Sequence, residues 1–155
     1  MATAGGLAGL VLGAVWLRRR YLVVEVDGHS MEPEFRSGDR VLVRRVPLRR
    51  IRPGDVVVVA DPARGRHPGP VAARDRPDPA GHPPGPRWLI KRAAAVPGEP
   101  VPGAVAAAVG VPADSPVPEE RLVVLGDNAD HSYDSRHHGY VHADQVLGRV
   151  LRRMR

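Results

Sequence analysis

The chain has no cysteine and few aromatic residues. Its 155 residues include no cysteine, and phenylalanine, tryptophan and tyrosine together make up 4%. The lack of cysteine excludes disulfide bonds, thiolate metal sites and a cysteine nucleophile. The scarcity of aromatic residues means that the core must be built from valine, leucine, isoleucine and alanine. The length suits one domain with such a core.

Lysine is almost absent as well. The 23 basic residues comprise one lysine, Lys91, and 22 arginines. Arginine keeps its proton in proteins, whereas a desolvated lysine can become a neutral amine and act as a base. Lys91 lies between the apolar segments 88–90 and 93–95, which favours a lysine selected for deprotonation. The alternative is a chance lysine whose stem packs while its charged end reaches water.

The net charge of +6 would suit a nucleic acid or an anionic membrane surface. The arginines occur in short clusters with no aromatic residues interleaved as stacking platforms, which disfavours nucleic acid. Four histidines fall within residues 131–142, but their spacing matches no known zinc motif. We therefore expect solvated loop histidines, no metal, no cofactor and no nucleic-acid partner.

The fold class follows from 17 glycines, 17 prolines and several valine-rich runs. So many helix-breaking residues exclude a helical bundle, and apolar runs bounded by proline and glycine predict a mostly β protein. Long Pro/Gly-rich loops are expected at about 61–86 and 103–118, the second with room for a short helix or hairpin. Strands are predicted at Leu22–Val26, Arg40–Val43, Val56–Ala60, Trp88–Ala95, Leu122–Leu125 and Val146–Leu151.

The N-terminal segment is apolar and then basic. Residues 2–17 carry no charge, and three arginines follow at 18–20. A helix over residues 2–17 would span about 24 Å, short of a hydrocarbon core of about 30 Å. A membrane anchor, a signal peptide and a buried helix are the alternatives; charge after the apolar core disfavours a cleavable signal. We expect an anchor over 1–20 and one domain over 21–155, although the positive-inside rule would place that domain in the cytoplasm.

Two polar segments are candidates for chemistry. Ser30 follows the first predicted strand, and Pro33 ends the sheet there, so the serine hydroxyl is presented on a bend. The segment 126–136 follows another strand and holds three aspartates, two serines and an arginine. Asp134 and Arg136 would share a face if extended, and Asp127 could reach another arginine. The alternative is a polar loop with a surface ion pair of little energy.

Taken together, these segments resemble the type I signal peptidase family, serine proteases of family S26. The resemblance covers about Val24 to Leu151 and rests on motifs that occur in the family's order. They are Ser30-Met31-Glu32-Pro33, then Gly54-Asp55-Val56-Val57-Val58, then Lys91-Arg92 ahead of Pro97-Gly98-Glu99, then Gly126-Asp127-Asn128 with Ser132, Asp134, Ser135, Arg136 and Gly139.

The resemblance implies roles for individual residues. Ser30 would be the nucleophile, Lys91 the general base, and Ser132 the hydroxyl that hydrogen-bonds and orients the lysine amine. Met31 would shape the substrate cleft, whereas Asp127, Asp134 and Arg136 would form ion pairs beside the site. The implied fold is a compact core of two antiparallel sheets with an N-terminal transmembrane helix and an active site near the membrane surface.

The expected function is a membrane-anchored serine endopeptidase that removes signal peptides from exported preproteins. Its partners would be the preprotein and the lipid bilayer, and its catalytic domain would lie on the extracytoplasmic face of the cell membrane. Two departures from the family pattern bear on this. Gly28 stands where some members have a serine that helps to stabilise the oxyanion, and the segment between Lys91 and Gly126 is short.

Alternative functions remain open. The short segment also fits a smaller branch, similar to the proteases that trim the leader of nickel superoxide dismutase. A self-cleaving protein like the LexA-like repressors would use the same serine–lysine pair, but no helix-turn-helix precedes Ser30. From a different class, a non-catalytic basic protein associated with membranes would not need Ser30 or Lys91 at all.

Overall fold

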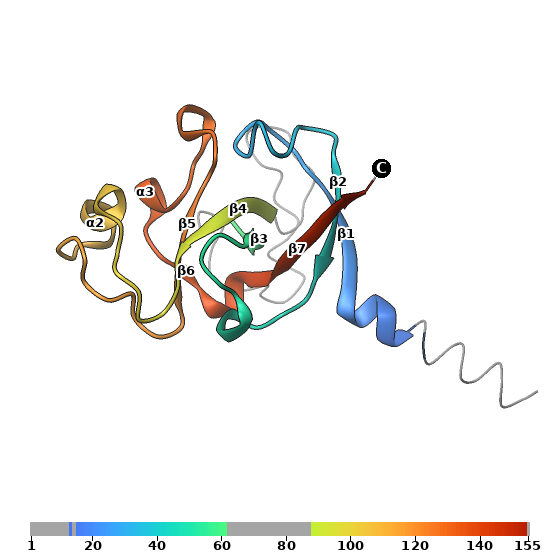
Figure 1. The fold of residues 1–155 in the computed structure, drawn as a ribbon, viewed down its shortest axis with the longest axis horizontal. Coiled ribbons are helices and arrows are strands. Elements are labelled where there is room, and N and C mark those ends of the chain that lie inside the picture. The colour runs from blue at the N-terminus through green and yellow to red at the C-terminus, as the bar shows by residue number, and fades with distance from the viewer. Residues whose placement is uncertain (1–12, 14, 62–87, 155) are drawn as a thin grey trace, which may run out of the picture.

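A single antiparallel sheet forms the body of the molecule. The computed structural model describes residues 13, 15–61 and 88–154 (Figure 1). Its seven strands follow the order β1-β2-β7-β3-β4-β5-β6 across the sheet. The strands are β1 (Tyr21–Glu25), β2 (Arg40–Arg44), β3 (Val56–Ala60), β4 (Trp88–Ala95), β5 (Arg121–Leu125), β6 (Val141–His142) and β7 (Val146–Met154).

Short helical segments connect the strands. Among the described residues, two are α-helices, α2 (Gly103–Val109) and α3 (Ser135–His138), and three are 3₁₀ turns, η1 (Leu48–Arg50), η4 (Ala129–His131) and η5 (Ala143–Gln145). Figure 1 places α2 and α3 together at one end of the molecule, and the N-terminal helix at the other. The helix α2 ends at Gly110, whose left-handed backbone (φ 70°) forms its C-cap.

The expectation of a mostly β fold is confirmed, but the expectation of two sheets is wrong. The long strand β7 pairs with β2 on one side and with β3 on the other. The pairing is irregular between Leu42 and Val43 and again between Val58 and Val59. Bulges of this kind increase local twist, so one sheet can curl without dividing into two.

The core lies on both faces of β3. Val57 and Val59 pack into one cluster of buried residues, while Val56 and Val58 pack into another. This alternation follows from the two-residue period of a strand. It explains why the segment 56–60 is apolar without interruption: a central strand covered on both faces has no side exposed to water.

A short helix precedes β1. Residues 15–20 are helical, and Trp16 and Leu17 are exposed, with the Arg20 guanidinium 5.1 Å from the Trp16 ring. Within the described residues, no helix is both long and apolar enough to cross a membrane. Most of the expected anchor lies outside the described residues, as does nearly all of the loop expected at 61–86.

Candidate functional site

Ser30 lies in the turn between β1 and β2, and its backbone is held on two sides. Its carbonyl accepts a hydrogen bond from the Asn128 N–H at 3.0 Å. The next residue, Met31, is fully buried and packs in the core beside β2 and β3. Met31 therefore anchors the turn to the core. Its expected role in shaping the substrate cleft stays a prediction.

Lys91 lies in the middle of β4 and reaches Ser30 across the fold. Its Nζ atom is 2.7 Å from the Ser30 Oγ atom, although the two residues are 61 positions apart in the chain. The Lys91 side chain is 3% exposed. This distance is within direct proton-transfer reach, and burial disfavours the charged form of an amine. The pair therefore has the geometry that a nucleophile and its base require.

Gly126 allows a third residue, Ser132, to lie close to Ser30. The pairing of Arg92 with Leu125 puts Lys91 beside the end of β5, where Gly126 follows. A Cβ atom on Gly126 would lie 2.2 Å from the Ser132 Oγ atom and 2.6 Å from the Ser30 carbonyl oxygen. Only glycine therefore allows Ser132 and Ser30 to approach the strand end this closely.

The Ser132 hydroxyl is fixed by Asp134. Ser132 is 6% exposed, and it donates a hydrogen bond of 2.6 Å to Asp134 Oδ2. The same carboxylate oxygen accepts the Gly126 N–H at 2.9 Å. The hydrogen bond from Ser132 to the Lys91 amine, which the family resemblance implies, stays a prediction.

Asp134 is itself a fully buried carboxylate held by many donors. It caps the N-terminus of α3, accepting the Arg136 N–H at 3.1 Å, and the Arg136 guanidinium binds both of its oxygens at 2.9 and 2.6 Å. Burial alone would raise the pKa of Asp134. The hydrogen bonds from Arg136, Gly126 and Ser132 outweigh burial and hold that pKa well below its usual range.

Asp127 forms a second ion pair, with Arg92. The Arg92 guanidinium donates to both Asp127 oxygens at 2.8 and 2.7 Å and to the Gly54 carbonyl at 2.9 Å, and it also contacts Glu34. These hydrogen bonds raise the pKa of Arg92 further above its ordinary value. Arg92 thus links its own motif, Lys91-Arg92, to the motifs that contain Gly54 and Asp127. Sequence reasoning gave Arg92 no role, and only its position beside Lys91 could have pointed to it.

The described histidines do not gather into a metal site. Across residues 15–61 and 88–154, no three side chains of histidine, aspartate or glutamate are grouped to hold a metal ion. His29 and Glu32 form an exposed pair at 2.9 Å. Burial lowers the pKa of His138, whose Nδ1 atom lies 3.1 Å from the Gly139 carbonyl.

Replacing Gly126 with alanine is expected to reduce any catalysis by Ser30 and Lys91 about 100-fold or more, because the new methyl group would displace Ser132 and the Ser30 backbone. Steady-state kinetics on the peptide substrate that the family resemblance implies would measure the loss. Gly103→Ala is the matched control, since a Cβ atom there would lie 4.0 Å from its nearest neighbour, Ala113. Equal activity of the two variants, with both folded, would contradict this arrangement.

Comparison with known protein families identifies the family of the chain. The model of the family described as signal peptidase, peptidase S26, matches residues 2–109 and 104–154. No curated protein matches the chain. Because the family match spans nearly the whole sequence, the chain belongs to the signal peptidase family, peptidase S26.

Proposed function

We propose that this protein is a serine endopeptidase that removes signal or leader peptides, with Ser30 as nucleophile and Lys91 as general base. The observation that carries the proposal is the 2.7 Å distance between Ser30 Oγ and Lys91 Nζ, with the amine buried. A serine hydroxyl is a weak nucleophile until an adjacent base takes its proton. A neutral amine at this distance is such a base.

The proposed reaction has two steps. Ser30 Oγ attacks the scissile carbonyl while Lys91 Nζ takes its proton, and the lysine then gives that proton to the leaving amine. Water, activated by the same amine, hydrolyses the ester on Ser30 and releases the second product. Because Gly28 offers no side-chain donor, the Ser30 backbone N–H is the candidate that stabilises the oxyanion.

Ser132 and Asp134 would position the base. The single hydroxyl proton of Ser132 is committed to Asp134, so the Ser132 oxygen presents only lone pairs to its other neighbours. An oxygen of this kind accepts an N–H from the lysine amine. That contact would turn the amine lone pair toward Ser30. Ser132 and Asp134 are therefore positioning residues in this proposal.

Exported preproteins are the proposed substrates, bound as an extended strand and cut after small residues. The proposed N-terminal anchor would hold the domain on the extracytoplasmic face of the cell membrane, where such preproteins emerge. The exposed Trp16 with Arg20 stacked on it supports an interfacial position for that helix, because tryptophan favours the membrane–water boundary. A dedicated leader peptidase for a single substrate is the second candidate, favoured by the arginines at 18–20.

The test is cleavage of a preprotein by the full chain in neutral detergent micelles, with the product's new N-terminus sequenced. Cleavage at the end of the signal peptide, lost in Ser30→Ala and retained in Ser115→Ala, supports the proposal. Cleavage that Ser30→Ala retains would favour a non-catalytic role for this chain. A topology reporter fused after Arg155 separates the substrates: an extracytoplasmic reporter supports general preprotein processing, and a cytoplasmic one supports the dedicated leader peptidase.

A further inference from the structure

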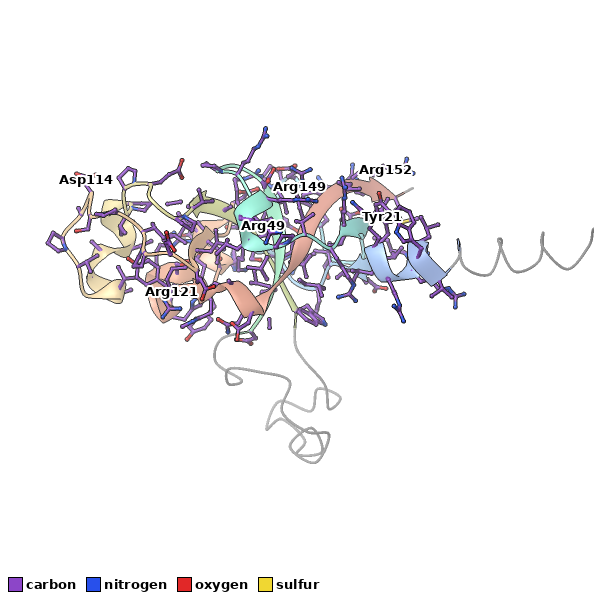
Figure 2. The ribbon with its side chains drawn as sticks, turned by 90° about the horizontal axis from the view of Figure 1, so that it is seen from below. Tyr21, Arg49, Asp114, Arg121, Arg149 and Arg152 are labelled. Carbon is purple, nitrogen blue, oxygen red and sulfur yellow. The ribbon has the colours of Figure 1, made fainter. Side chains whose placement is uncertain are left out.

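A pocket of about 370 Å³ is lined almost entirely by arginine. Figure 2 shows Arg49 of η1 and Arg149 of β7 near each other, on the face that also carries Arg152. Apart from Val46, the lining residues are all cationic: Arg44, Arg49, Arg50, Arg52 and Arg149. We propose that this pocket binds a phosphate group.

The fold forces these charges together. Arg44 and Arg149 are direct partners in the pairing of β2 with β7, and like charges directly opposite each other destabilise a sheet. Gly148 makes the approach close, since a Cβ atom there would lie 2.2 Å from the Arg44 carbonyl oxygen. The short turn η1 then adds two more cations, so the repulsion is concentrated on one concave surface.

The protein neutralises little of this charge. Asp55 accepts from Arg149 at 3.3 Å. Among the described residues, no carboxylate pairs with the other four arginines of the pocket, and the Arg44 Nε atom is buried without a hydrogen-bond partner. A bound anion would offset the repulsion among the guanidinium groups that line the pocket; the Arg44 Nε atom has no exposed surface and would not contact it.

The arginine side chains indicate which anion the pocket binds. A guanidinium group is a planar fork that binds phosphate oxygens in pairs. A phosphate group has enough oxygens for several forks, whereas one carboxylate satisfies only one. None of the described residues that line the pocket is an aromatic side chain on which a nucleobase could stack, so an isolated phosphate group fits better than a nucleic-acid strand.

The position of the pocket favours a lipid headgroup as the source of the phosphate. Arg45 N–H donates to the Arg20 carbonyl at 2.9 Å, which joins the end of β2 to the end of the N-terminal helix. Tyr21 pairs with Arg44 in the adjoining strands. This choice of source rests on the proposed membrane anchor; the phosphate site itself does not.

Calorimetry on the full chain in neutral, phosphate-free micelles tests the site with two probes. One is inorganic phosphate, and the other is phosphatidylglycerol with six-carbon chains; the zwitterionic phosphatidylcholine of the same length is the lipid control. We expect saturable binding that Arg49→Gln with Arg50→Gln weakens about tenfold or more. The exposed pair Arg36→Gln with Arg40→Gln removes the same charge elsewhere and should change binding less than about twofold.

The outcomes separate the site from diffuse charge. Tighter binding of phosphatidylglycerol than of inorganic phosphate supports a lipid site, and the reverse order supports a site for free phosphate. Saturation by neither probe, or equal weakening in both variant pairs, overturns the proposal. So does tighter binding of a single-stranded oligonucleotide than of either probe. Ser30→Ala should bind both probes as the wild type does, so loss of catalysis and loss of this site are distinguishable.

Discussion

Ser30→Ala is expected to lower kcat for peptide cleavage by about 10⁴-fold or more, and Lys91→Met should lower it equally. The reason is that Ser30 Oγ and Lys91 Nζ, 2.7 Å apart, would carry one proton transfer between them. A unit of this kind is lost when either partner is removed. The double variant should therefore be no slower than either single one, which single-turnover kinetics on a purified preprotein would measure.

Lys91→Arg makes the test sharper. Arginine keeps the positive charge but cannot give up its proton in a protein, so this variant should be as inactive as Lys91→Met. Ser115→Ala, at a serine in the segment between α2 and β5, is the control and should cleave normally. Substantial activity in Lys91→Arg would show that the charge of residue 91 matters and that its loss of a proton does not.

Asp134→Ala is expected to reduce the free energy of unfolding by about 3–5 kcal/mol, a large fraction of the stability of a small domain. The carboxylate is fully buried and accepts hydrogen bonds from Gly126, Ser132 and Arg136. Its removal leaves buried donors without acceptors. Urea unfolding at neutral pH would measure the loss, with Glu119→Gln, an exposed carboxylate, as the control expected to change little.

The lowered pKa of Asp134 predicts that the stability of the protein depends on pH in the acid range. Because the folded protein lowers the pKa of Asp134, the carboxylate stabilises the native state at pH values above its unfolded pKa of about 3.9. That contribution falls as the pH drops through the lowered pKa. Asp134→Asn should unfold more easily than the wild type at neutral pH, with a difference that shrinks below about pH 4. A constant difference across this range would contradict the account.

The sequence predicts the strands better than the connections. Apolar runs bounded by proline and glycine place β3 and β4 correctly, because a buried strand has a strong compositional signal. Short elements escape such reasoning, among them β6 with two residues and α3 with four polar ones. Asp134 and Arg136 would share a face if the segment were extended. They meet instead at a helix start, because the aspartate side chain caps the backbone of α3.

For the candidate site, too, some features can be predicted from the sequence and others cannot. The unusual single lysine and the ordered motifs point to Ser30 and Lys91 before any coordinates are known. Spacing cannot reveal that Arg92 ties Asp127 to Gly54, because those contacts depend on how the sheet curls. The requirement for glycine at residue 126 is likewise invisible in the sequence, since it arises from the close approach of Ser132 and Ser30.

The single lysine allows the most direct test of the proposed base. Lysine labelled with ¹⁵N should give one side-chain amine signal from the whole chain, so its titration by NMR can be assigned to Lys91 without ambiguity. A pKa for this amine clearly below the roughly 10.4 of a free lysine, moving on Ser30→Ala, is the result we predict. A pKa at or above that value, unchanged in Ser30→Ala, would contradict the assignment of Lys91 as the base.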